Sequence, residues 1–206
     1  MHRYAEGMDT PQPAPKRRVA DLGAITALAH PIRLDLYDAL SQYGPATASM
    51  LGERLGESSG STSYHLRILA KHELVREVEG RGTARERWWE RTPGGLTLHG
   101  GPDADEATRL ATGLVVEHWN ANRAALLADF VERGFDELPG EWVDASTVST
   151  INLRLTSAQL AEIVERFDHW IDELIEPYQG REDPGSRPVQ LHFNAFPLLD
   201  GTETPS

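Results

Sequence analysis

Small polar and basic side chains recur on one side of residues 58–72. One stripe of the helix predicted there, with its margins, holds Ser59, Gly60, Ser61, Ser63, Tyr64, Arg67 and Lys71. No acidic residue lies between positions 58 and 72. Small residues at the start of a helix let its backbone approach base edges in the major groove, and arginine or lysine can bind guanine or phosphate. The pattern predicts DNA recognition; the alternative is an ordinary solvated helix.

Two helices and a tight turn must position this stripe. The first helix is predicted over residues 47–55, and Gly56 suits its end because glycine readily adopts a positive φ. Ser58 suits the N-cap of the second helix, since its hydroxyl can accept from free backbone amides of the first turn. The inward stripe of that second helix is predicted to be Thr62, Leu66, Leu69 and Ala70. This layout is a helix-turn-helix.

A hairpin is predicted directly after the second helix. Two strand-like runs, residues 74–78 and 87–90, flank the turn GRGTARE. Arg81 and Arg85 lie near its tip, where basic side chains can reach the neighbouring DNA backbone or minor groove. The hairpin therefore fits a DNA-binding wing, and the alternative is a solvated hairpin that only caps the domain.

Residues from about 27 to 91 resemble the ArsR-type winged helix-turn-helix transcriptional regulators, in a larger branch with an extra C-terminal region. The motifs are ALAHPIRLDLYDAL at 27–40 and LGESSGSTSYHLRILAKHELV at 55–75. The resemblance implies a dimeric DNA-binding regulator, most often a repressor. It implies that the operator is read by Ser59, Ser61, Ser63, Tyr64 and Arg67. For His65 it leaves two roles, a DNA contact or inward packing, and the adjoining apolar stripe favours packing.

The chain departs from this family in two respects. Glu73 stands where the family commonly has glycine. Glycine readily ends a helix with a positive φ, so the same ending of the second helix is in doubt here. Cysteine is absent, which excludes thiolate sensing and disulfide switching. His118 has no ligand-type side chain three or four residues away, whereas His169 has acidic residues at those intervals. A solvated ion pair explains His169, so we predict no metal site.

The negative charge is concentrated outside the proposed DNA-binding region. The formal net charge is −12. Residues 16–93 hold 12 basic and 10 acidic residues, a balance of +2, whereas residues 94–206 hold 7 basic and 20 acidic, a balance of −13. The distribution leaves residues 19–93 compatible with a nucleic-acid partner. No run approaches a membrane span and no secretory segment opens the chain, so we expect a soluble, cytoplasmic protein.

The sequence predicts an α+β, mainly helical protein with five regions. Residues 1–18, rich in proline and poor in large apolar groups, are predicted to be a disordered N-terminal arm, mostly solvated, although its basic end is a candidate for touching DNA. The winged helix-turn-helix domain is 19–93, with a first helix at 19–29, and 94–102 is a linker. A helix at 103–135 follows, ended by Gly134. It is predicted to form the dimer, and the alternative is a helix buried within one subunit. Residues 146–199 alternate as strand, helix and strand, a β-α-β unit for dimerisation or effector binding.

Aromatic residues in these last regions are candidates for a pocket that binds a small apolar molecule. They are Trp119, Phe167, Trp170 and Phe193. The alternative is that they only build the core. No P-loop, dinucleotide fingerprint, nucleophile elbow or Cys-His arrangement is present, so we predict neither an enzyme nor a cofactor.

The predicted function is a sequence-specific transcriptional regulator, a repressor that binds an inverted-repeat operator as a homodimer. Its predicted partners are double-stranded DNA, a second copy of the chain and a small-molecule effector. The alternative is a winged-helix protein-protein interaction module that binds no DNA. The absence of acid from the 58–72 stripe favours the regulator.

Overall fold

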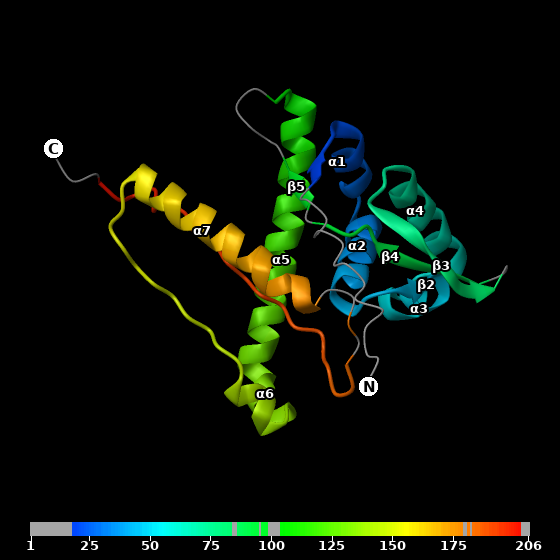
Figure 1. Ribbon diagram of the computed structural model, residues 1–206. Helices are drawn as coiled ribbons and strands as arrows, with labels where there is room; N and C mark the ends of the chain where they lie inside the picture. The colour runs from blue at the N-terminus through cyan, green and yellow to red at the C-terminus, as the bar shows by residue number, and fades with distance from the viewer. Residues whose placement is uncertain are drawn as a thin grey trace, which may run out of the picture. The chain divides into compact units, whose positions relative to one another are not determined.

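The computed structural model describes residues 18–83, 86–94, 96–98, 104–178, 181 and 183–202 (Figure 1). Residues 1–17 of the predicted arm (1–18) and Arg85 lie outside these residues, whereas Arg18 is described and belongs to a strand. Backbone contacts divide the chain into two units, 1–143 and 144–206. Each unit is described by itself.

Four short helices build the first part of unit 1. They are α1 (Leu22–Leu28), α2 (Pro31–Tyr43), α3 (Ala48–Leu55) and α4 (Ser59–Lys71). Asp21 caps α1, its carboxylate accepting from the Ala24 amide at 2.7 Å, and Pro31 occupies the first turn of α2, where a missing amide costs nothing. The helix predicted at 19–29 therefore begins later than expected, because Arg18–Ala20 form a strand, β1.

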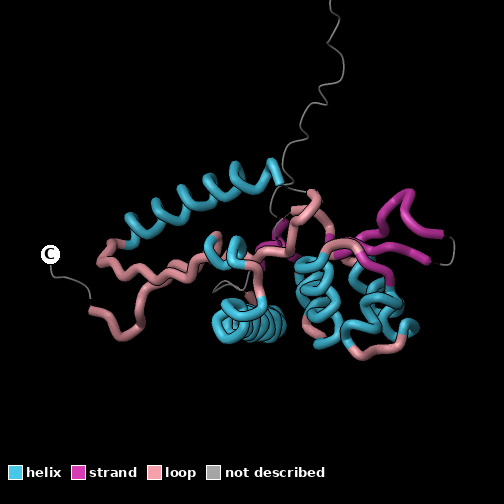
Figure 2. The backbone as a smooth tube through the Cα atoms, turned by 90° about the horizontal axis from the view of Figure 1, so that it is seen from below, coloured by secondary structure: helices cyan, strands magenta, loops and turns pink. Residues whose placement is uncertain are grey.

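The wing belongs to a small antiparallel sheet. Its strands are β2 (Ala46–Thr47), β4 (Glu86–Arg91) and β3 (Val75–Thr83), in the order β2-β4-β3. Val75 lies opposite Arg91, which confirms the predicted hairpin. Figure 2 shows β3 and β4 extending together beyond the helices.

A second, parallel pair joins the two ends of the domain. β1 pairs with β5 (Leu96–Leu98), with Arg18 opposite Leu96 and Ala20 opposite Leu98. The prediction of a linker at 94–102 is therefore wrong for residues 96–98. The flanking glycines obscured a three-residue strand whose two leucines pack against the core.

One hydrophobic core holds these elements together. Its fully buried side chains come from all of α1, α2, α4 and β3, and include Ile25, Leu28, Leu36, Leu66, Leu69 and Val75. The predicted inward stripe of α4 is confirmed by burial of Thr62, Leu66 and Leu69, with Ala70 partly buried. We call residues 18–98 the head.

A 32-residue helix, α5 (Glu106–Glu137), follows the head. One side of it packs inward, with Val115 fully buried and Trp119 against the core. The helix continues past Gly134, so the predicted end there is wrong. Gly134 is buried, and a Cβ at that position would lie only 2.7 Å from the Phe130 ring, so a larger residue would clash there. The helix ends at Leu138, the residue before Pro139, where proline disfavours helical geometry.

The C-terminal unit contains one long helix and lacks the predicted strands among its described residues. A short helix, α6 (Gly140–Asp144), precedes it, and α7 (Ser157–Ile175) is followed by the 3-10 turn η1 (Glu176–Tyr178). Thr156 caps α7, accepting from the Gln159 amide at 3.2 Å. Residues 146–155 and 189–199 form no strand. A strand needs a hydrogen-bonding neighbour, and two short strands alone make a marginal sheet.

No helix among the described residues combines the length and apolar character needed to cross a membrane.

Candidate nucleic-acid interface

The turn between α3 and α4 is fixed by side-chain caps and two glycines. Thr47 caps α3 through the Met50 amide at 3.3 Å, and Ser58 caps α4 through the Ser61 amide at 3.2 Å. Gly56 ends α3 with φ +70°, as predicted. Gly52 was missed by the sequence analysis. A Cβ there would lie 2.7 Å from the Glu57 carbonyl oxygen, so glycine lets the turn pass close to α3.

The outward side of α4 carries the predicted DNA-reading residues. Ser59, Gly60, Tyr64, Arg67 and Lys71 are exposed, and Ser61 and Ser63 are half-buried. We call these seven residues the α4 face. Among the described residues, neither Arg67 nor Lys71 has a carboxylate partner. Both cations therefore remain available to an external anion.

His65 packs inward and is only 9% exposed. Its ring lies 4.8 Å from the His30 ring and 5.2 Å from the Tyr64 ring, measured between centroids. Burial lowers the pKa of His65, and the nearby His30 and Arg33 lower that pKa further. The imidazole links α4 to the start of α2 and is not part of the exposed α4 face.

The C-terminus of α4 is stabilised by an arginine from β1. Arg18 donates to the carbonyl oxygens of Glu73 at 3.1 Å and His72 at 3.2 Å, and it also pairs with the Glu73 carboxylate at 3.1 Å. Glu73 adopts φ +54°, the left-handed conformation that glycine would adopt more readily. The second helix thus ends with a positive φ although the residue there is not glycine. The role of Arg18 could not be predicted from sequence periodicity, because Arg18 lies 55 positions away along the chain.

Only some of the wing arginines are free of acidic neighbours. Arg76 pairs with Glu90 at 2.7 Å, and Arg87 pairs with Glu77. Arg81 instead lies over the Trp88 ring, 3.7 Å from its centroid, and has no carboxylate partner within the described part of the chain. Among the described residues of the wing, Arg81 is thus an exposed cation without a carboxylate partner.

The predicted aromatic pocket residues fall into both units. Phe167 stacks on Phe193 with centroids 3.6 Å apart and lies 5.7 Å from Trp170. Trp119 belongs to unit 1, where its ring lies 6.2 Å from Tyr37.

The structure gives His118 neighbours that its helix lacks. Its Nε2 lies 3.3 Å from Asp38 and 3.5 Å from Asp35, both on α2. Burial raises the pKa of Asp38, and a hydrogen bond from Asn122 opposes that shift. His169 pairs with Glu173 at 3.4 Å on an exposed face. Within the described ranges, no group of three or more His, Asp or Glu side chains is arranged to hold a metal ion.

Comparison with known proteins identifies the domain. Residues 28–78 match a sequence model of the helix-turn-helix domain, and no curated protein matches the chain. Among solved structures, the adhesin competence repressor AdcR of Streptococcus pyogenes is 15% identical, covering 73% of this chain and 83% of its own, with a TM-score of 0.33. An apo double mutant of Lactococcus lactis ZitR is 15% identical, covering 73% and 84%, with a TM-score of 0.30.

Neither structure is similar enough for its properties to be carried over. The domain model is different, because it spans α2, α3 and α4, the elements that build the α4 face. The β3-β4 hairpin directly after it supplies a wing. The chain therefore contains a winged helix-turn-helix domain, the fold predicted from the motifs at 27–40 and 55–75.

Proposed function

We propose that the protein is a sequence-specific transcriptional repressor that binds an inverted-repeat operator as a homodimer. The observation that carries this proposal is the α4 face, which lies on the outward side of α4 and holds no acidic residue. It carries two cations, Arg67 and Lys71, for which the described residues supply no carboxylate partner. Its first turn presents the free amides and the positive end of the helix dipole, which favour phosphate.

On this proposal α4 lies in the major groove. Ser59, Gly60 and Ser61 are small enough to bring the start of the helix close to base edges. Arg67, one turn beyond Tyr64, reaches a base edge, and Lys71 at the end of the helix meets the backbone. Arg81 on the wing holds a phosphate, and Arg85 is proposed to do the same. His65 serves by packing.

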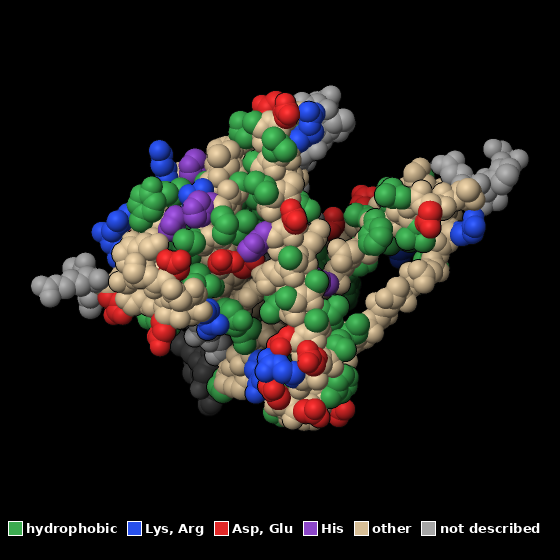
Figure 3. All heavy atoms as spheres, turned by 180° about the vertical axis from the view of Figure 1, so that it is seen from behind, with side chains coloured by type: hydrophobic (Ala, Val, Ile, Leu, Met, Phe, Trp, Pro, Cys, Tyr) green, Lys and Arg blue, Asp and Glu red, His purple; other side chains and the backbone are tan. Residues whose placement is uncertain are grey.

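The homodimer is proposed to form through the outward side of α5. Eight exposed positions follow one another at alternating intervals of four and three residues: Leu110, Leu114, Glu117, Ala121, Ala124, Ala128, Val131 and Phe135. We call them the α5 stripe. Such spacing is that of a helix-helix seam. Figure 3 shows hydrophobic side chains exposed along α5, with charged side chains at its two ends.

The order of the α5 stripe suits a second copy of the same helix. Alanines occupy the centre and large residues occupy the ends. An antiparallel pair with its two-fold axis between Ala121 and Ala124 places Leu110 of one copy opposite Phe135 of the other. The alanines then let the helices approach closely, and the same surface serves both copies, as two-fold symmetry requires.

DNA recognition is tested by selecting binding sites from random duplexes and then measuring affinity at two salt concentrations. We expect Arg67→Ala to relax base preference, at a cost of about 1 to 3 kcal/mol on the selected site. We expect Arg81→Ala to weaken binding to all DNA sequences by a similar factor. Arg76→Ala is the matched control, because Glu90 already neutralises that wing arginine. If the native protein selected no sequence, a protein-interaction module would replace the proposal.

The homodimer is tested by light scattering after chromatography. Ala124→Glu places like charges on both sides of the proposed axis, so we expect monomers. Arg109→Glu, exposed near the start of α5 and on a different side of the helix from the stripe, is the control and leaves the dimer intact. A dimeric Ala124→Glu protein would show that α5 does not form the interface.

A further inference from the structure

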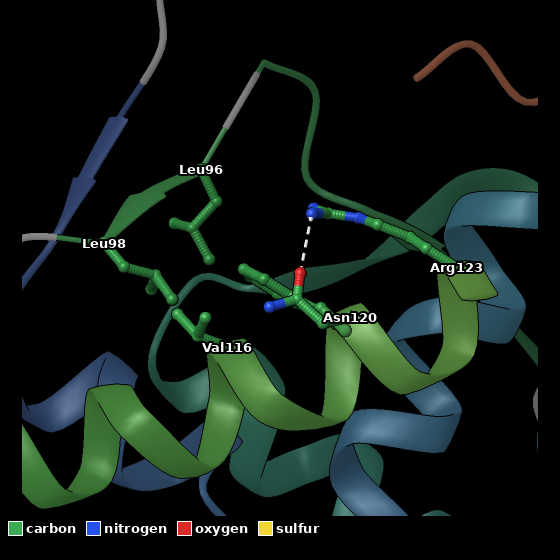
Figure 4. Close-up of a pocket in the computed structure, with 6 residues that line it drawn as sticks. Leu96, Leu98, Val116, Asn120 and Arg123 are labelled. Carbon is green, nitrogen blue, oxygen red and sulfur yellow. Dashed lines mark hydrogen bonds between the residues drawn. The ribbon is translucent and has the colours of Figure 1, made fainter. Parts of the chain in front are cut away.

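A pocket of about 270 Å³ lies between β5 and α5, both in unit 1. Leu96 and Leu98 of the strand face Val116, Trp119, Asn120 and Arg123 of the helix (Figure 4). Four of the six side chains are apolar. The pocket therefore offers an apolar floor with its polar groups gathered around one arginine.

Arg123 is the arginine of α5 with the weakest bonding. Its Nη1 donates to the Asn120 amide oxygen at 3.5 Å, the limit of a hydrogen bond, and no carboxylate pairs with it in the described part of the chain. By contrast, Arg109 donates to the Ala104 carbonyl at 2.8 Å, and Arg133 pairs with Asp129 and Glu137. A half-buried guanidinium beside an apolar pocket has unused donors directed to one small volume.

We propose that this pocket binds a small organic acid. The carboxylate accepts from Arg123 and from the amide of Asn120, and a single ring or short aliphatic chain covers Leu96, Leu98, Val116 and Trp119. Arginine matches a carboxylate in charge and shape. A neutral ligand would leave the guanidinium desolvated and unpaired, and an amine would be repelled by it. One arginine with one amide suits a monoanion.

The floor of the pocket is joined to the recognition helix. β5 pairs with β1 along its whole length, and Arg18 of β1 binds the last carbonyls of α4. A ligand that moves Leu96 and Leu98 therefore acts on the strand pair that carries this cap. This consequence, unlike the site itself, rests on the proposed DNA-binding function.

Binding is measured without DNA, on the full chain, by calorimetry and by fluorescence of Trp119. The probes are benzoate, phenylacetate, hexanoate and octanoate, with benzyl alcohol and benzylamine as uncharged and cationic partners of benzoate. We expect at least one acid to bind saturably with one site per chain. Benzoate should bind about tenfold more tightly than benzyl alcohol, and benzylamine should not bind, because only the acid pairs with Arg123.

Three variants test the site. Arg123→Ala should weaken acid binding by about tenfold or more and leave benzyl alcohol unchanged, while Arg123→Lys retains part of the affinity. Val116→Trp fills the pocket from an exposed position and should abolish binding of both compounds. Arg109→Ala, on the same helix but outside the pocket, is the matched control. Circular dichroism shows that each variant is folded.

Two outcomes overturn the proposal: no acid of the panel binds saturably, or Arg123→Ala and Val116→Trp bind acids as the native protein does. Because these measurements contain no DNA, they stand or fall independently of operator binding. If both functions hold, the bound acid should change DNA affinity several-fold in the native protein and not in Arg123→Ala. An unchanged DNA affinity would remove the link through Arg18 and leave the site.

Discussion

The head and the C-terminal unit treat their apolar side chains differently. In the head, Leu28, Leu36 and Leu66 are fully buried in one core. In the C-terminal unit, Ile151 is 77% exposed and Leu191 is 64% exposed. Every strand of the head finds its hydrogen-bonding neighbour within residues 18–98, whereas residues 146–155 and 189–199 form no strand. The comparison shows that a segment with alternating apolar residues forms a buried strand only where another strand is available to pair with it.

The largest expected effect separates the two regions by stability. Leu66→Ala removes a fully buried side chain from the head and should lower the free energy of unfolding by about 3 kcal/mol. Leu153→Ala makes the same change at a 66% exposed position and should cost less than about 1 kcal/mol. Urea denaturation measures both. Equal losses would break the comparison, because Leu153 would then be covered in solution.

A smaller effect is expected from the arginine that joins β1 to α4. Arg18→Ala removes two hydrogen bonds to helix-end carbonyls and should lower the free energy of unfolding by about 1 to 2 kcal/mol. Amide exchange should quicken at the end of α4. Arg181→Ala in the C-terminal unit is the control. Its exposed side chain pairs with Asp183 at 2.8 Å and donates weakly to the Pro177 carbonyl at 3.5 Å, so the substitution should leave stability unchanged. Unchanged exchange in Arg18→Ala would show that the contact does not stabilise α4.

Glu73 provides a stabilising change. Glu73→Gly relieves the positive φ and should raise the free energy of unfolding by about 1 kcal/mol relative to Glu73→Ala. Both variants lose the ion pair with Arg18, so their difference isolates the backbone. Thermal unfolding of the two is the measurement. An alanine variant as stable as the glycine variant would show that the left-handed conformation costs nothing here.

The smallest expected effect is a pH dependence of the head. The pKa of His65 is lowered on folding, so the unfolded chain binds more protons than the folded one as the pH falls below about 6.5. The stability that depends on neutral His65 is complete above that pH and declines below it. The difference between the denaturation midpoints at pH 7.5 and pH 5.5 should therefore be smaller in His65→Phe than in the native protein.

The sequence predicted most of the head because its signals are local. Ser58, Gly56 and the stripe through Leu66 specify α3, the turn and α4 within a few residues of one another. The hairpin followed from a glycine-rich turn between two apolar runs. The same spacing predicted which residues form the α4 face. For His65 the sequence left two orientations open, and the structure shows that this side chain packs inward.

What the sequence could not predict depends on distance along the chain or on very short elements. Arg18 meets Glu73 across 55 positions, and Asn122 meets Asp38 across 84. β1 and β5 have three residues each, too few for a recognisable alternation. Arg123 could be recognised as part of a pocket only once Leu96 and Leu98 were placed beside it. In the C-terminal unit, alternation indicated strands but could not supply their neighbours.

The β1-β5 pair also decides where the head can be cut. A fragment that stops at Arg91, the last residue of the wing, would lack the strand that holds Arg18–Ala20 in place. A fragment that starts at Leu22 would leave Leu96–Leu98 without their neighbour. The head therefore needs both Arg18–Ala20 and Leu96–Leu98, and loss of either strand should loosen the end of α4 even though every residue of the helix-turn-helix is retained.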